Sequence, residues 1–197
     1  GKYLSRQPTL ADVRSMWVGL RPLVKPQDDD GENTKKISRE HTVLASKTGL
    51  VTVTGGKWTT YRAMAEDVLT ECFQIGSLPA RPAGVTVHLP LVGSPGQAQT
   101  KHNINQAQGL HSYGTEAAQV KELPGADQWL TDSLSVAMVR FAARFEYART
   151  VEDVLARRSR LLFLDARKAA EIAPRVAVIL EQELNREVQL DEFLLLA

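Results

Sequence analysis

Two glycines, a lysine and two threonines are the residues whose types and spacing best suit chemistry; they lie in the segment Thr54-Gly-Gly-Lys-Trp-Thr-Thr-Tyr-Arg62. The segment follows the apolar, β-branched run 50–53 and opens a long helical pattern. Such a turn brings backbone N–H groups, a helix N-terminus and one cationic side chain against an anion. An ordinary strand-to-helix turn accounts for one glycine, but not for Gly55, Gly56 and Lys57 together. The sequence therefore predicts a turn that contacts an anionic ligand.

Two common nucleotide-binding motifs do not fit this turn. In the phosphate loop G-x-x-x-x-G-K-[ST], the first glycine would stand at Val51 and a serine or threonine at Trp58, so the motif fails at both positions. No G-x-G-x-x-G follows a candidate strand, and the dinucleotide fingerprint is therefore missing from this sequence.

Composition narrows the class of protein. A chain of 197 residues with 43% hydrophobic and 24% charged residues is typical of a soluble globular protein, and no apolar run approaches the length of a membrane span. The single cysteine, Cys72, excludes an internal disulfide framework and fits a reducing compartment. The net charge is only +1, yet residues 1–62 carry the basic excess. That distribution favours a small anionic ligand over nucleic acid, which calls for a longer basic stripe.

The first part of the chain predicts a small α+β arrangement. We expect a short helix over 9–17 and a strand over 17–24 that contains Arg21 and ends at Pro22 and Pro26. Two strands, 40–45 and 50–54, alternate in polarity around a Thr48-Gly49 turn and predict a hairpin. A helix then begins near Trp58 and stops before Gly76.

The second part predicts an all-helical domain. Gly, Pro and Ser punctuate residues 76–96, which we interpret as a linker between a domain at 1–75 and a domain at 97–197. Beyond it no strand pattern is found: moderate helices are expected at 97–108 and 115–122, and a strong one at 133–148. Thr150 and Asp165 are expected to cap two further helices, with Pro174 kinking or restarting the second, and a last helix covers about 186–195. The fold class is α+β, mainly α-helical in its C-terminal domain.

Several of these segments resemble one enzyme family. The blocks Trp17-Val-Gly-Leu-Arg-Pro-Leu23, Ile37-Ser-Arg-Glu-His41 and the glycine turn look like the FAD-dependent, respiratory glycerol-3-phosphate dehydrogenases. The arginine-rich run 149–160 and Leu164-Asp-Ala-Arg167 resemble the helical C-terminal domain of the same family. The resemblance spans about residues 10–185. It implies that the chain is a C-terminal portion, because the family's FAD fingerprint and catalytic histidine region come earlier in a longer chain, and that this portion is inactive alone.

The resemblance implies the following roles. The family oxidises sn-glycerol 3-phosphate to dihydroxyacetone phosphate with FAD and passes electrons to quinone. Arg21 is the first candidate for the substrate phosphate, since a guanidinium on a proline-flanked strand offers a bidentate fork; Arg39 is the second and Lys57 the third. The cofactor-binding residues are the two glycines, Lys57, Trp58 and Thr59, whose backbone N–H groups would stabilise an anionic reduced flavin. No metal is implied, no general base is expected in this part, and His41 is expected to be structural.

The same residues also allow other interpretations. Taken as isolated residues, Arg21 could form a salt bridge, and Arg39 and Lys57 could be ordinary surface residues. The cluster of Arg157, Arg158 and Arg160 is either a solvated helix end or an interface to another domain or to anionic lipid. The alternative functions are a helical interaction module without catalysis and an oxidase that uses oxygen instead of quinone. Expected partners are the preceding FAD domain, a peripheral contact with the cytoplasmic membrane from the cytoplasmic side, and a homodimer through unpaired strand edges.

Overall fold

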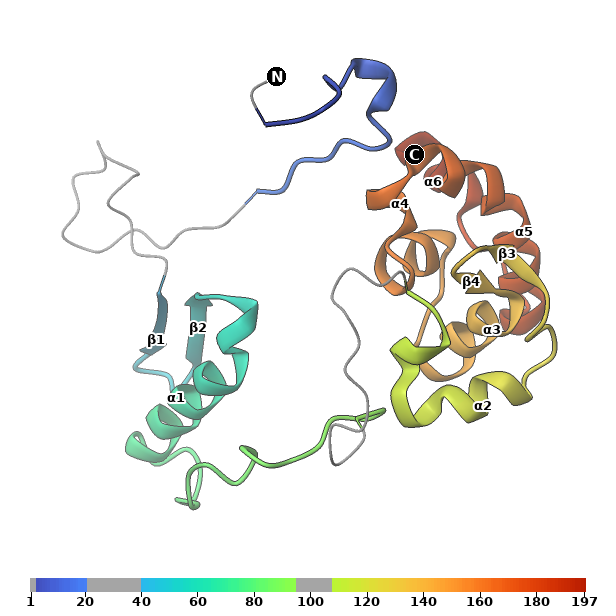
Figure 1. Cartoon of the computed structure of the whole chain (residues 1–197). Helices are drawn as coiled ribbons and strands as arrows, with labels where there is room; N and C mark the ends of the chain where they lie inside the picture. Colours follow the sequence, from blue (N-terminus) through green and yellow to red (C-terminus); the bar gives the residue numbers. More distant parts are fainter. Residues whose placement is uncertain (1–2, 21–39, 95–107) are drawn as a thin grey trace. The chain divides into compact units, whose positions relative to one another are not determined.

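The computed structural model describes residues 3–20, 40–94 and 108–197. The chain forms two compact units, one of residues 1–18 with 90–197 and one of residues 19–89. The boundary after Leu89 lies within the segment 76–96 that the sequence marks as a linker (Figure 1). The two units are treated separately below.

The smaller unit is a hairpin covered by one helix (Figure 1). Strands β1 (His41–Ala45) and β2 (Val51–Gly55) are antiparallel, with His41 opposite Gly55 and Ala45 opposite Val51. The turn closes through Gly49 N to Ser46 O at 3.0 Å, with Gly49 at a positive φ of 85°. A short 3₁₀ turn, η3 (Trp58–Thr60), leads into helix α1 (Tyr61–Gln74), which packs on both strands. The hairpin and this helix confirm the sequence prediction.

The smaller unit has no closed core. Among its described residues none is fully buried, and Leu44, Val53 and Leu69 keep 40–50% of their surface exposed. The segment 75–89 folds back on α1, where the Gly84 N–H donates to Glu66 Oε1 at 3.0 Å and Arg62 donates to the same oxygen at 2.6 Å. Glu66 therefore ties the helix to the loop after it.

The larger unit is mainly helical (Figure 1). Its elements in chain order are η1 (Leu10–Asp12), η4 (Leu110–Glu116), α2 (Ala117–Glu122), β3 (Trp129–Thr131), β4 (Leu134–Ser135), α3 (Val136–Phe145), η5 (Asp153–Arg158), α4 (Leu161–Leu164), α5 (Ala166–Leu184) and α6 (Leu190–Leu196). The mainly helical α+β class predicted from the sequence is confirmed. The sequence missed the hairpin β3–β4, whose tight turn forms because Thr131 Oγ1 accepts from the N–H groups of Ser133 and Leu134.

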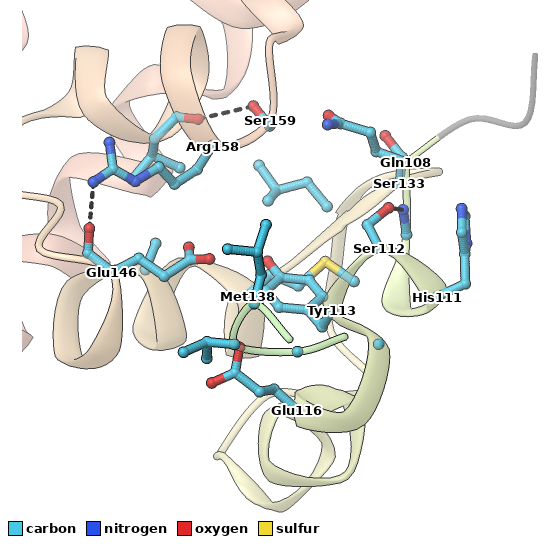
Figure 2. A pocket seen from close by; sticks show the side chains of 18 of the residues that line it. Gln108, His111, Ser112, Tyr113, Glu116, Ser133, Met138, Glu146, Arg158 and Ser159 are labelled. Atoms are coloured by element: carbon cyan, nitrogen blue, oxygen red, sulfur yellow. Dashed lines mark hydrogen bonds between the residues drawn. The ribbon is translucent and has the colours of Figure 1, made fainter. Parts of the chain in front are cut away.

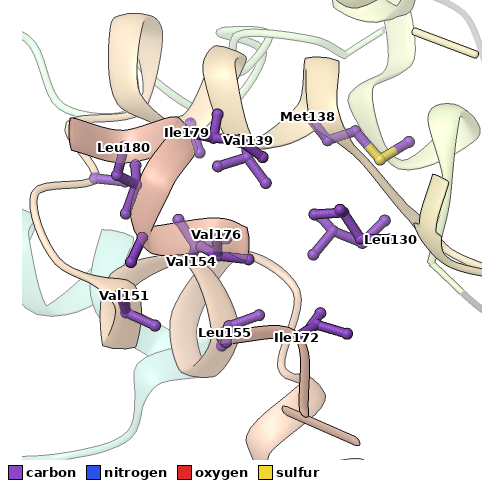
Figure 3. Packing of buried hydrophobic residues seen from close by; sticks show 14 of the residues in the cluster. Leu130, Met138, Val139, Val151, Val154, Leu155, Ile172, Val176, Ile179 and Leu180 are labelled. Carbon is purple, nitrogen blue, oxygen red and sulfur yellow. The ribbon is translucent and has the colours of Figure 1, made fainter. Parts of the chain in front are cut away.

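The core of this unit lies between α3, η5, α5 and α6. Figure 3 shows Val139, Val176 and Leu180 from α3 and α5 meeting Val154 and Leu155 of η5. Phe141 and Phe193, the largest buried side chains, are at most 1% exposed. At about 25 cal/mol for each Å² of buried apolar area, each such ring contributes a few kcal/mol to folding. All the fully buried hydrophobic residues described in the chain belong to this unit.

Side chains cap the starts of α3, of α5 and of the helical stretch that contains η5, whereas α2, α4 and α6 have no side-chain cap. Ser135 Oγ accepts from Met138 N at 3.3 Å to begin α3, and Asp165 Oδ1 accepts from Lys168 N at 3.0 Å to begin α5, as expected for Asp165. Thr150 Oγ1 accepts from Asp153 N at 3.1 Å, as expected for a threonine cap. Helix α5 continues through Pro174, so the helix does not restart there, and the other expected alternative, a kink at Pro174, stays a prediction.

The start of the chain packs on the larger unit, where the sequence assigned residues 1–75 to a single domain. Arg14 pairs with Asp165 at 2.8 Å, Ser15 Oγ donates to Leu162 O at 2.7 Å, and the rings of Trp17 and Phe163 meet edge-on at 5.3 Å. Only η1 forms of the helix expected over 9–17, since the Arg14 carbonyl accepts from Ala166 N instead. Residues 17–20 are not a strand, and the rest of the strand expected over 17–24 lies outside the described residues.

Candidate functional site

The glycine turn is built from two residues at positive φ. β2 ends at Gly55 with φ 77°, and Gly56 follows with φ 79°, a region that side chains with a Cβ rarely adopt. A Cβ on Gly55 would lie 2.7 Å from the Glu40 carbonyl oxygen, and one on Gly56 would lie 2.7 Å from Met64 Sδ. Both glycines are therefore required by conformation and by space, which explains why the sequence has two of them.

Lys57 and the helix start complete the turn. Lys57 is extended, with φ −135° and ψ 144°, and the chain then enters η3 and α1. The first N–H groups of this helical stretch have no upstream helical carbonyl to bind, so they carry the partial positive charge of a helix N-terminus. Although Thr59 and Thr60 are residues of a type that often caps helices, neither η3 nor α1 has a side-chain cap, and Thr60 Oγ1 donates to the Lys57 carbonyl at 3.0 Å.

A small hollow of about 290 Å³ lies at this turn. Its lining consists of Glu40, His41, Gly56, Lys57, Thr60 and Ala63. The hollow has room for a phosphate-sized group or for one edge of a larger ligand, but not for a whole dinucleotide. Lys57 brings a cation and the helix start brings N–H donors, both of which suit an anion, while Glu40 brings an opposing negative charge to the same hollow.

The predicted site residues differ in whether they lie at the hollow, are exposed beside it or fall outside the described residues. Gly56 and Lys57 line the hollow, and Gly55 adjoins it at the end of β2. Trp58 is 88% exposed and stacks obliquely on Tyr61, with ring centroids 5.8 Å apart, and Thr59 is exposed on η3. Arg21 and Arg39, the first and second candidates for a phosphate contact, lie outside the described residues.

His41 has a partner that the sequence did not reveal. Its Nε2 lies 2.7 Å from Asp67 Oδ2 on α1, and its side chain is 24% exposed. An ionised carboxylate only accepts hydrogen bonds, so Nε2 carries the proton and donates. The two residues are 26 positions apart, and no sequence pattern connects them.

The arginine cluster of the larger unit divides into three environments. Arg157 pairs with Glu152 at 2.6 Å and with Asp153 at 3.0 Å. Arg158 instead donates to the backbone carbonyl of Glu146, and Arg160 is exposed at the left-handed residue before α4. The three side chains therefore do not form one continuous basic face.

Arg158 also lines a second hollow, of about 550 Å³, in the larger unit. Figure 2 shows Tyr113 and Met138 at its centre and Glu116 and Glu146 along one side. Burial, and then the charge of Glu116, raise the pKa of Glu146, while Arg158 opposes the shift. Burial, followed by the negative charge of Glu146, raises the pKa of Tyr113. No sequence pattern pointed to this hollow, because its residues come from separate elements.

The fold and the turn define a class: a mainly helical C-terminal domain linked to a strand–glycine–helix turn suited to an anion. Residues 84–189 match the family described as the C-terminal domain of alpha-glycerophosphate oxidase. The chain belongs to this family.

Curated relatives extend the match over most of the chain. The mitochondrial glycerol-3-phosphate dehydrogenase of Bos taurus is 36% identical over 88% of this chain and 26% of its own length. The corresponding protein of Homo sapiens is 35% identical over the same shares. The mitochondrial glycerol-3-phosphate dehydrogenase of Arabidopsis thaliana is 35% identical over 92% of this chain and 33% of its own length. The chain thus spans about a quarter to a third of the relatives it matches, and no solved structure matches it.

Proposed function

We propose that this chain forms the C-terminal part of a FAD-dependent enzyme that oxidises sn-glycerol 3-phosphate to dihydroxyacetone phosphate and passes electrons to quinone. The observation that carries the proposal is the glycine turn with Lys57 beside a hollow of about 290 Å³, in a chain of the alpha-glycerophosphate oxidase family. The relatives named as glycerol-3-phosphate dehydrogenases support the substrate.

The donor set of the turn fits one edge of a flavin. Two consecutive glycines expose the backbone, and the helix start directs N–H groups at an electron-rich partner. Bound FAD would supply the two-electron acceptor for the oxidation. The residues that would hold it are Gly55, Gly56, Lys57, Trp58 and Thr59, mainly through backbone groups. Because the hollow is small, the described residues would contact only part of the cofactor, and the preceding FAD domain would bind the rest.

The cationic side chains would bind the substrate phosphate. Lys57 offers an ammonium at the edge of the hollow, and Arg21 and Arg39 are proposed to add bidentate contacts. No residue of this chain is assigned as general base. Quinone as the electron acceptor, a peripheral membrane contact and a homodimer are parts of the same proposal. No helix in the described residues is long and apolar enough to cross a membrane.

Dye-linked oxidation of glycerol 3-phosphate tests the proposal. The chain is expressed with its preceding segment, and wild type is compared with Lys57→Ala and Arg21→Ala. A lost charged hydrogen bond costs about 1.5–3 kcal/mol, so KM should rise roughly tenfold or more with a smaller change in kcat. Lys47→Ala is the matched control, because Lys47 is an exposed lysine at the opposite end of the same hairpin. An unchanged KM in Lys57→Ala and Arg21→Ala removes both residues from the phosphate site.

Two further measurements separate the alternatives. Oxygen consumption that accounts for all the substrate oxidised identifies an oxidase and overturns the quinone part. Purified 1–197 should be colourless, and a stoichiometric flavin on it overturns the dependence on a preceding domain. Specific retention of a partner by residues 97–197, without any substrate oxidation by the longer chain, favours an interaction module instead.

A further inference from the structure

The hydrogen bond between His41 and Asp67 spans the glycine turn. His41 is the first residue of β1 and lies opposite Gly55 in the antiparallel register. Asp67 is on the second turn of α1, and its Oδ2 lies 2.7 Å from His41 Nε2. The pair therefore connects the strand on one side of the turn with the helix that leaves it.

Gly56 is enclosed by the same two elements. A Cβ at Gly56 would lie 3.0 Å from His41 Cβ and 2.7 Å from Met64 Sδ. Met64 and Asp67 are three residues apart, so they project from the same side of α1. One face of the helix thus covers Gly56 with Met64 and fixes His41 with Asp67, which leaves the turn little freedom to move.

The contribution of the His41–Asp67 pair to folding is too small to explain why the pair lies at this turn. The Asp67 side chain is 58% exposed, and a polar contact at such a site contributes little to folding. Its position matters more, because His41 and Lys57 line the same hollow of about 290 Å³. A displacement of Lys57 or of the turn would lengthen the hydrogen bonds to a phosphate bound in this hollow and so weaken its binding.

We propose that His41 and Asp67 are a positioning pair that holds the start of α1, and with it Lys57 and the backbone of Gly56, in the geometry that receives the phosphorylated substrate. The role for substrate rests on the proposed function. The mechanical part, that the pair holds the turn, stands independently of it.

Hydrogen exchange on the 197-residue chain tests the mechanical part. In Asp67→Ala and in His41→Ala, the amide of Thr60, which donates to the Lys57 carbonyl at 3.0 Å, should exchange about tenfold faster than in wild type, and the double variant should be no faster than either single one. Asp67→Asn should restore protection, since its amide oxygen still accepts from Nε2. Thr70→Val is the matched control: it removes one hydrogen bond, Thr70 Oγ1 to Glu66 O at 2.9 Å, farther along α1. A Thr60 amide that is unprotected in wild type, or whose exchange Asp67→Ala does not change, overturns the proposal.

Kinetics of the chain extended by its preceding segment test the role for substrate. Asp67→Ala should raise KM for glycerol 3-phosphate about tenfold and leave kcat within about twofold, while Asp67→Asn and Thr70→Val stay near wild type. An unchanged KM in Asp67→Ala overturns the role for substrate. A wild-type enzyme that does not oxidise glycerol 3-phosphate contradicts the proposed function alone, and the exchange result still decides whether the pair holds the turn.

Discussion

Replacing Glu183 should destabilise the larger unit more than any other single charge change that we can design from the described residues. Glu183 lies near the end of α5 with its side chain 7% exposed, and it pairs with Arg140 and with Arg144 of α3, the latter at 2.5 Å. Arg140 and Arg144 are 20% and 42% exposed. The carboxylate therefore joins the two longest helices of the unit through both of its oxygens.

The magnitude follows from what the substitution leaves behind. Glu183→Ala leaves two neighbouring guanidinium groups without their shared counter-charge, and breaking a buried pair in this way costs about 3–5 kcal/mol. The partial exposure of Arg144 lowers that figure, and we expect a loss of about 2–4 kcal/mol in the free energy of unfolding. Glu183→Gln keeps hydrogen-bond capacity and should lose about 1–2 kcal/mol. Glu171→Ala, which removes an exposed pair with Lys168 on the same helix, should lose less than about 0.5 kcal/mol.

The pH dependence gives a second, independent readout. Hydrogen bonding from Arg144, opposed by burial and reinforced by the charges of Arg144 and Arg140, lowers the pKa of Glu183 below its ordinary value of 4.5. A pKa lowered in the folded state gives stability that is complete above the unfolded-state pKa and is lost as pH falls through the folded-state pKa. Wild-type stability should therefore fall below about pH 4.5, and Glu183→Gln should show a shallower fall.

Urea unfolding of the 197-residue chain, followed by far-UV circular dichroism, measures both effects. The free-energy difference comes from the shift of the transition midpoint at constant slope. If Glu183→Ala is no less stable than Glu171→Ala at neutral pH, the ion pairs of Glu183 with Arg140 and Arg144 do not stabilise the packing of α3 on α5.

Three other predictions test the packing, a turn and a helix cap. Pro174→Ala should stabilise the larger unit by about 1–3 kcal/mol in the same unfolding assay, because Pro174 is exposed and removes a hydrogen bond inside a continuous α5. No gain in stability would show that the chain needs the proline there. Gly114→Ala should cost about 2 kcal/mol or more, since its Cβ would lie 1.9 Å from the Gly93 carbonyl oxygen at a φ of 55°, and near-wild-type stability would contradict that contact. Asp165→Ala should cost about 1–2 kcal/mol, because it removes the cap of α5. Arg14→Ala removes only an exposed partner of Asp165 and should cost under about 1 kcal/mol. Equal losses in the two variants would refute the cap as the main role of Asp165.

Local patterns predicted local structure. The alternation around Thr48-Gly49 gave the hairpin, the helical pattern after Trp58 gave α1, and Asp165 before an apolar periodicity gave the start of α5. Strands of two or three residues, such as β3 and β4, are too short for a period-two pattern to stand out, so that hairpin was missed.

Contacts between distant positions were beyond the reach of sequence patterns. Arg14 and Asp165 are 151 positions apart, and the helix expected over 9–17 gave way because the backbone there binds α5 instead. At the candidate site the sequence pointed to the glycines and Lys57 from their spacing, and the structure places Gly56 and Lys57 at one hollow, while their role in binding stays a prediction. It could not identify Asp67 as the partner of His41, since that pairing depends on how α1 packs on β1.

The two units differ in how their candidate sites are supported. The larger unit encloses its hollow with a dense core that includes fully buried phenylalanines, so its geometry is fixed by packing. The smaller unit has a two-stranded hairpin and one helix, and a two-stranded hairpin is marginally stable alone in water. None of the residues described there is fully buried, so polar contacts such as His41–Asp67 must do much to hold the glycine turn in place. An exposed hydrogen bond of modest strength can therefore decide the geometry of the glycine turn, although the same bond inside the larger unit would matter little beside the core.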